Sequence, residues 1–324
     1  MTGRYGVAAA VAIATAGVMA LPTVAFAAET MSAQVTTTNP TVGQQLTIEG
    51  DVTGASMYPV TVVATREDST GVTTMPVDSE PTDAQGHFTL HDTPPARGRV
   101  TYHLSADTGA ATTDVTTTVA GKPTDLSMHV RPSPASAEQS VHVTAHLDSP
   151  TTNRDVTLYL RPYKGSKTQF DQGAVDANGD RTADHVVHRR TTFIATFAGD
   201  SVYEPATARV TLRVRAVLDE ALKGYFRTSG GARIYHRDDN PVLAVHMTPE
   251  RKGACLYFRA QHKSHGDWVK SAVSSCVHTD STGRAIGVLQ GHHIAGVAYR
   301  LRAEWHGTKA IARRSGAWMR LEFR

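Results

Sequence analysis

The sequence of 324 residues has little charge, few aromatic residues and only two cysteines. Charged residues make up 19% of the chain and aromatic residues 6%, whereas hydrophobic residues make up 40%. This composition excludes a disordered polyelectrolyte and suffices for packed cores. The 26 glycines and 15 prolines are too few for a collagen-like or low-complexity protein. The net charge of only +3 argues against a dedicated nucleic-acid-binding protein.

Sequence motifs of catalysis are also missing. There is no Gly-x-Ser-x-Gly, no His-Glu-x-x-His and no glycine loop of the kind that binds phosphate. We therefore expect a protein that is not an enzyme and that has no cofactor.

Candidate metal ligands are sparse. Asp176-Ala177-Asn178-Gly179-Asp180 resembles part of a calcium loop, but it lacks the glycine and the glutamate that an EF-hand requires at later positions. We interpret it as a hairpin turn. His142 and His146 share one face of a predicted strand without a third ligand, and His292-His293 lies in a glycine-flanked turn. We expect these histidines to be solvated and predict no metal site.

The one long hydrophobic run lies at the start of the sequence. Arg4 precedes the uncharged stretch Val7–Val18, and Ala25-Phe26-Ala27 fits a signal-peptidase site. We predict a signal peptide over residues 1–27 and hence a secreted, extracellular protein. The alternative is an uncleaved anchor, because residues 6–28 are just long enough to span a bilayer. No later segment is apolar enough to span a membrane, so we expect no membrane span after cleavage.

Cys255 and Cys276 are the only cysteines. In an exported protein such a pair predicts one disulfide, and the alternative is two buried thiols. The bond would close a loop of about 20 residues and contribute roughly 3 kcal/mol. The spacing is not Cys-x-x-Cys, so nothing indicates redox chemistry.

Apolar and polar residues alternate along several segments, among them Leu46–Glu49, Val141–Leu147 and Ala208–Ala216. Such alternation predicts half-buried antiparallel strands, and turn residues at regular intervals are typical of β-sandwiches. Leu218–Lys223 is the exception, which we predict to be a short helical linker.

A turn and a strand recur in the same order three times. The turns are Asp83–Gly86, Asp176–Gly179 and Asp280–Gly283, and an alternating strand follows each of them. The repetition predicts an all-β protein of three tandem sandwiches after the signal peptide. Their predicted boundaries are 28–121, 122–216 and 217–324.

The alternating strand Phe193–Phe197 is followed by Gly199-Asp200, Tyr203 and Pro205. This order resembles the late-strand signature of bacterial Ig-like repeat domains. The resemblance is good over 122–216 and weaker in the other two segments. It implies Greek-key sandwiches of about seven to nine strands that serve as extracellular spacers or adhesion modules. It implies no catalytic residues, because such sandwiches have many unrelated roles.

Charge differs strongly between the segments. Residues 29–121 contain 3 basic and 11 acidic side chains, a net charge of −8, whereas residues 217–324 contain 17 and 9, a net charge of +8. This polarity favours attachment to a polyanion or self-association of acidic with basic parts. The alternative is a solvated surface without a partner.

All three tryptophans lie in the last segment. Trp305 shares its alternation with Leu301 and is predicted to be in the core. Trp318 alternates outward with Arg320, and Trp268 follows a predicted turn. Tryptophan beside arginine is typical of sites for sugar rings and cations. We therefore predict Trp268, Trp318 and Arg320 as ligand-binding residues.

Together these patterns predict a secreted, non-enzymatic Ig-like repeat protein that acts in binding or adhesion or as a spacer, loosely associated with the cell surface. Its expected partner is an envelope polymer, a polysaccharide or an extracellular protein, contacted through the basic last segment. No nucleic-acid partner is expected. A carbohydrate-binding module and an inhibitor of secreted hydrolases are the alternatives.

Overall fold

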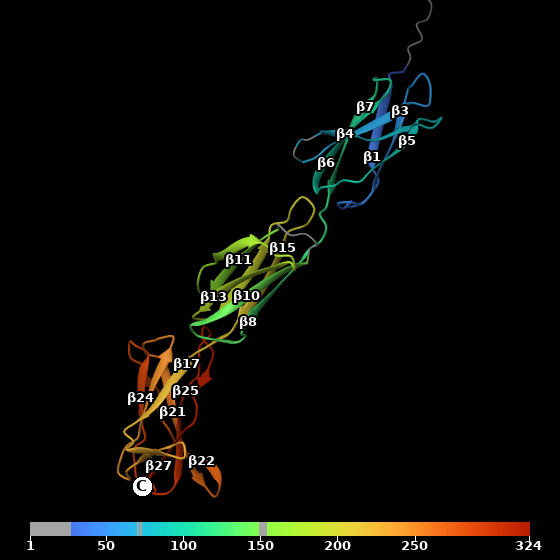
Figure 1. Ribbon diagram of the computed structural model, residues 1–324. Helices are drawn as coiled ribbons and strands as arrows, with labels where there is room; N and C mark the ends of the chain where they lie inside the picture. Colours follow the sequence, from blue (N-terminus) through green and yellow to red (C-terminus); the bar gives the residue numbers. More distant parts are fainter. Residues whose placement is uncertain (1–26, 70, 72, 149–153) are drawn as a thin grey trace, which may run out of the picture. The chain divides into compact units, whose positions relative to one another are not determined.

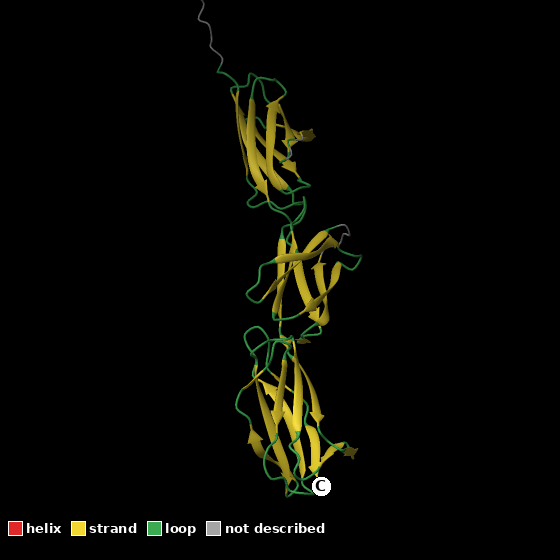
Figure 2. Ribbon diagram, turned by 90° about the vertical axis from the view of Figure 1, so that its left-hand side faces the viewer, coloured by secondary structure: helices red, strands yellow, loops and turns green. Residues whose placement is uncertain are grey.

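The computed structural model describes residues 27–69, 71, 73–148 and 154–324. Except for Ala27, the predicted signal peptide lies outside the described residues. All helical or extended elements assigned in these ranges are β-strands, and none of them is a helix (Figure 2). The described residues form no helix that is long and hydrophobic enough to span a membrane. The chain divides into two compact units, Met1–Ala120 and Gly121–Arg324.

The first unit contains two antiparallel sheets (Figure 1). Alternate side chains of both sheets are buried, among them Ile48 and Leu90 from one sheet and Tyr102 and Leu104 from the other. In spatial order the strands are β1 (Thr30–Val35), β2 (Leu46–Thr53) and β5 (His87–Asp92) in one sheet, and β4 (Thr73–Pro81), β3 (Thr61–Glu67), β6 (Gly98–Ala106) and β7 (Thr112–Val119) in the other.

The second unit begins with a sandwich that has its own hydrophobic cluster, which includes Val143, Leu158 and Phe193. The predicted strand Ala208–Ala216 is interrupted at Arg213, where the chain changes its partner from β14 to β9. The strands are β13 (Asp180–Val187), β10 (Gln139–Asp148) and β8 (Asp125–Arg131) in one sheet, β12 (Thr168–Ala174), β11 (Asp155–Pro162), β14 (Thr191–Phe197) and β15 (Ala206–Leu212) in the other, and the parallel pair β16 (Val214–Arg215) and β9 (Ala135–Ser136).

Strands β17 to β27, which we call the C-terminal sandwich, surround a further cluster that includes Leu243, Leu301 and Phe323. That the two clusters of this unit are separate domains stays a prediction. The small sheet consists of β17 (Val217–Lys223), β20 (Val242–Thr248) and β24 (Arg284–Val288). The large sheet consists of β18 (Arg227–Ser229), β19 (Ala232–Tyr235), β27 (Met319–Phe323), β25 (Ala298–Trp305), β21 (Cys255–Ser264) and β22 (Asp267–Val273), with β23 (Val277–His278) on β21 and β26 (Arg314–Ser315) on β25.

The expected helical linker at Leu218–Lys223 is wrong. This segment is strand β17, which pairs antiparallel with β20 along its whole length. Leu218 and Leu222 fit the spacing of a helix, but the same residues also alternate as in a strand. Pairing with β20 satisfies the backbone and buries Leu222, so tertiary packing overrides the local preference.

The repeated turn is confirmed in atomic detail. In each copy one aspartate Oδ1 accepts hydrogen bonds from the backbone N–H groups two and four residues later. These bonds lower the pKa of the three aspartates, Asp83, Asp176 and Asp280. The prediction of a turn at Asp176–Asp180 is therefore confirmed, but the turn is not a hairpin, because β12 before it and β13 after it pair with other strands in different sheets.

Two single-residue expectations have different outcomes. Trp305 is 4% exposed and lies in the core, as predicted. His293 was expected to be solvated and is instead 5% exposed, with its ring stacked on Phe323 at a centroid distance of 4.0 Å. Burial lowers the pKa of His293. A turn position alone does not show that the chain folds its side chain back onto the core.

Candidate ligand-binding site

The outer face of the large sheet in the C-terminal sandwich collects basic side chains. Strands β25 and β21 alternate between buried side chains, such as Leu301 and Leu256, and side chains directed away from the core. Figure 1 shows β22 and β27 near the C-terminus. The cationic face comprises Trp318, Arg320, Arg302, Arg300, Arg259, Gln261, Lys263, Lys270 and Trp268.

The strand register orders these side chains in rows across the sheet. Arg320 on β27 is directly opposite Arg300 on β25. Arg300 is in turn opposite Gln261 on β21, and Gln261 is opposite Lys270 on β22. We call these four residues the cationic row. Beside it, Arg302 on β25 is opposite Arg259 on β21, and on the other side Lys263 is opposite Trp268. No carboxylate belongs to the cationic row.

Two tryptophans hold the arginines of β25 in a ladder of cation–π contacts. The Arg300 guanidinium carbon lies 4.3 Å from the Trp268 ring centroid and 4.4 Å from that of Trp318. Arg302 lies 4.2 Å from the Trp318 ring. Trp318 therefore contacts the guanidinium groups of both arginines.

The carboxylates beside the face neutralise only part of its charge. Glu304, 7% exposed, is ion-paired with both Arg259 and Arg302. The Arg300 Nε donates a hydrogen bond to Oε1 of Gln261 at 2.7 Å, a neutral acceptor. Desolvation, followed by the positive charges of Arg302 and Arg320, lowers the pKa of Arg300, although an arginine keeps its proton at neutral pH.

The remaining cations of the face are exposed. Arg320, Lys263 and Lys270 have no ion-pair or hydrogen-bond partner among the residues that the structure describes. A group of like charges on one sheet face is unfavourable unless counter-ions or a ligand compensate it. The face therefore has the chemistry of a site for oxyanions, which arginine binds with two parallel hydrogen bonds.

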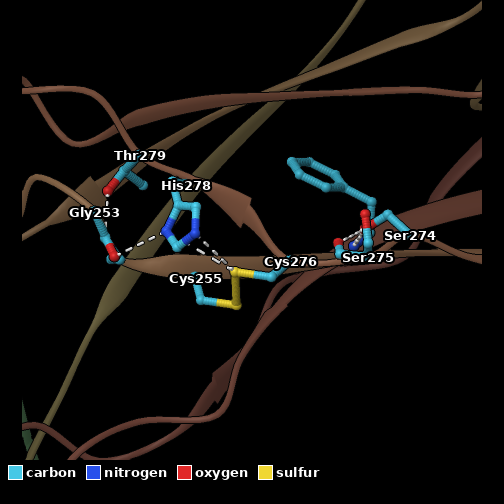
Figure 3. The surroundings of a disulfide bond; sticks show 9 residues. Gly253, Cys255, Ser274, Ser275, Cys276, His278 and Thr279 are labelled. Atoms are coloured by element: carbon cyan, nitrogen blue, oxygen red, sulfur yellow. Dashed lines mark hydrogen bonds between the residues drawn. A yellow bond between two sulfur atoms is a disulfide. The ribbon is translucent and has the colours of Figure 1, made fainter.

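The predicted disulfide is present between Cys255 and Cys276, whose Cα atoms are 5.2 Å apart. Figure 3 shows His278 beside this bond, with Nε2 at 3.6 Å from the Cys276 sulfur. The His278 Nδ1 also lies 3.2 Å from the carbonyl oxygen of Gly253. The disulfide joins the start of β21 to the segment that follows β22, so it fixes one border of the large sheet.

Clusters of metal-binding side chains are not found in the described ranges, where no three of His, Cys, Asp and Glu come together in a suitable group. His142 and His146 instead contact single carboxylates across the strand pair β10–β13. Their Nδ1 atoms lie 2.9 Å from Asp184 and 2.8 Å from Asp180, respectively. These contacts are cross-strand pairs that support the sheet.

Comparisons with known proteins found no matching family model and no matching curated protein. Among solved structures, a tetra-tandem repeat from the extending region of a large adhesion protein has 15% identity and a TM-score of 0.47, covering 89% of this chain and 74% of the other. Invasin, a bacterial integrin-binding protein, has 13% identity and a TM-score of 0.32, covering 87% and 59%. Three N-terminal domains of the Hoc capsid protein of bacteriophage RB49 have 10% identity and a TM-score of 0.31, covering 92% and 99%. Similarity at this level assigns neither a ligand nor an activity.

The structure places the three sequence-predicted binding residues on the same sheet face. Trp268 and Trp318 are half-buried and Arg320 is exposed. Trp268 lies at the start of strand β22. Arg300 and Arg302, which connect the tryptophans, were not among the predicted residues. The sequence pattern contained the signal for them. Arg300 and Arg302 alternate with the inward residues Leu301 and Ala303 of the same strand, so they had to face outward.

Proposed function

We propose that this chain is an extracellular, non-enzymatic binding or adhesion protein that attaches to an anionic polymer of a cell envelope through its cationic face. Cleavage of the signal peptide would release it outside the cell, where a disulfide is stable. The observation that carries the proposal is the group of exposed cations, Arg320, Lys263 and Lys270, without acidic partners in the described residues.

The electrostatics of the whole C-terminal sandwich support this role. Residues 217–324 have a net charge of +8, so the field around the face attracts anions before contact. The tryptophan ladder holds Arg300 and Arg302 in place without consuming all their N–H donors. A ligand would thus meet arginines that have already lost part of their side-chain freedom, which reduces the entropy cost of binding.

A carbohydrate-binding module remains the second candidate because both predicted tryptophans lie on this face. Stacking on neutral sugars requires a free indole face. Trp318 has two cation–π partners, Arg300 and Arg302, and Trp268 has one, Arg300. Arginines therefore already cover part of both indole rings, and the geometry favours an anionic ligand.

The test is co-sedimentation of the mature chain, residues 28–324, with isolated envelopes and with an insoluble neutral polysaccharide. Raising the salt from about 0.05 M to about 0.5 M shortens the Debye length from roughly 13 Å to roughly 4 Å. We expect envelope binding at low salt that falls at least about tenfold at high salt. Binding that persists at high salt on the neutral polysaccharide would support the second candidate instead.

A matched pair of charge reversals separates a local effect from net charge. Arg320→Glu changes the cationic face, whereas Arg284→Glu changes an exposed arginine on β24 of the opposite sheet. Both lower the net charge equally. We expect the first to abolish most envelope binding and the second to leave most of it. Equal losses would contradict a site on the cationic face.

A further inference from the structure

The register and the side-chain contacts of the large sheet point to the direction and chemical class of the ligand. We infer that a linear acidic glycan lies across the strands, along the cationic row of Arg320, Arg300, Gln261 and Lys270. This inference rests on the proposed function and specifies its ligand. It differs from a general charge attraction because it selects one line across the face.

The spacing of the row fits a chain with repeated oxyanions. Neighbouring strands are about 4.8 Å apart, so the row from β27 to β22 spans roughly 14 Å. Arg320 and Arg300 are adjacent, and the backbone of Lys270 lies two strands beyond Arg300. Gln261 occupies the gap and can offer its amide N–H₂ to a hydroxyl or carboxylate, because its Oε1 already accepts from Arg300.

A ligand that ran along the strands instead would meet side chains of both charges. A chain following β25 from Arg300 past Arg302 would meet Glu304, whose carboxylate is already bound to two arginines. A chain following β27 from Arg320 would meet Glu322 two residues later. Glu322 thus borders the row on one side. On the other side the Arg302–Arg259 pair comes next, and Glu304 neutralises part of its charge, whereas the cationic row itself contains no carboxylate.

The aromatic residues favour a glycan over a single-stranded nucleic acid. Proteins that bind single strands stack successive bases on several aromatic platforms. Here both tryptophans already contact arginines, Trp318 two of them and Trp268 one. The face therefore offers mainly charge contacts and few free aromatic rings, which suits an acidic sugar chain.

The decisive experiment compares two lysines of the same face in the mature chain. Lys270 belongs to the cationic row, whereas Lys263 is on β21, in the next row. Binding of linear oligogalacturonate is measured by calorimetry for the wild type, Lys270→Gln and Lys263→Gln, with a neutral malto-oligosaccharide and single-stranded DNA as competing ligands. Circular dichroism checks that each variant remains folded.

We expect Lys270→Gln to weaken oligogalacturonate binding roughly two- to fivefold, the usual range for one exposed charge contact, and Lys263→Gln, which removes a cation of the same face outside the row, to weaken it by a clearly smaller factor. Arg320→Gln combined with Lys270→Gln should weaken it about tenfold if the contacts act independently. The neutral sugar should bind far more weakly than the acidic one.

Each other result has a definite meaning. A loss confined to Lys263→Gln, or equal losses in both lysine variants, would overturn the proposed direction and leave an anion-binding face. Tighter binding of DNA with the same dependence on Lys270 would overturn the glycan as ligand. No binding of any anionic probe or envelope by the wild type would instead overturn the proposed function itself.

Discussion

At the scale of single residues, one histidine of the first unit is placed between two carboxylates. The Nδ1 of His103 lies 2.8 Å from Asp114, and its Nε2 lies 3.0 Å from Glu67. These hydrogen bonds, that to Asp114 first, raise the pKa of His103. All three side chains are more than a third exposed, so solvent screening limits their contribution to at most about 1 kcal/mol.

This arrangement predicts a pH dependence of stability that His103→Gln removes. Because the pKa is raised in the folded state, the contribution is complete below about pH 6.5, the value of an unperturbed histidine, and is lost as the pH rises through the folded value. We expect the variant to be less stable than the wild type at about pH 5.5 and nearly equal at about pH 9. Urea unfolding, followed by hydrogen exchange in residues 28–120, measures the difference. A difference independent of pH would contradict the assigned pair.

At the scale of elements, the turn before β24 depends on one glycine. Gly283 has a φ of +73°, and a Cβ atom there would lie 2.7 Å from the carbonyl oxygen of Met247 on the paired strand. The backbone N–H of Met247 donates to the carbonyl oxygen of Gly283 at 2.9 Å. Both the backbone conformation and the close approach to β20 therefore require glycine.

Two alanine substitutions separate these requirements. Gly253 in the same sandwich has a φ of +75° but nothing within 4 Å of a Cβ atom. We expect Gly253→Ala to cost about 1–2 kcal/mol, the penalty of the left-handed conformation. Gly283→Ala should cost a further 1–3 kcal/mol or so, because the strands must move apart. Chemical denaturation of both variants is the measurement, and similar costs would show that the contact with Met247 relaxes easily.

At the scale of the whole molecule, the chain consists of two compact units, and its disulfide belongs to only one of them. The bond between Cys255 and Cys276 closes a loop with a sequence separation of 21 residues. Restricting the unfolded chain over such a loop contributes roughly 3 kcal/mol. This stabilisation should remain within the unit that contains the bond.

The expected result for Cys255→Ala combined with Cys276→Ala is therefore a local loss of stability. Hydrogen exchange should accelerate in the C-terminal sandwich and remain unchanged in residues 28–120. Retained binding to envelopes under conditions where the variant is folded would show that the bond stabilises the sandwich without forming the ligand contacts. Faster exchange in both units would contradict their independence.

The alternation of strands, the repeated aspartate turn and the pairing of the only two cysteines could be predicted without the structure. The first two features are local. Side chains of a strand alternate between its two faces, and the aspartate of an Asp-x-x-Gly turn bonds to the backbone of the same turn. The two cysteines leave no choice of partner. The outward direction of Trp318 and the core position of Trp305 follow from the same parity.

Which strands are neighbours emerges only in the folded chain, and the candidate site depends on these neighbours. Arg300 and Arg320 are adjacent because β27 returns antiparallel beside β25, a pairing that no local pattern specifies. For the same reason Leu218–Lys223 became a strand rather than a helix, because β20 was available as a partner. Long-range pairing thus turned scattered arginines and tryptophans into one face, since cross-strand contacts join residues that the sequence keeps far apart.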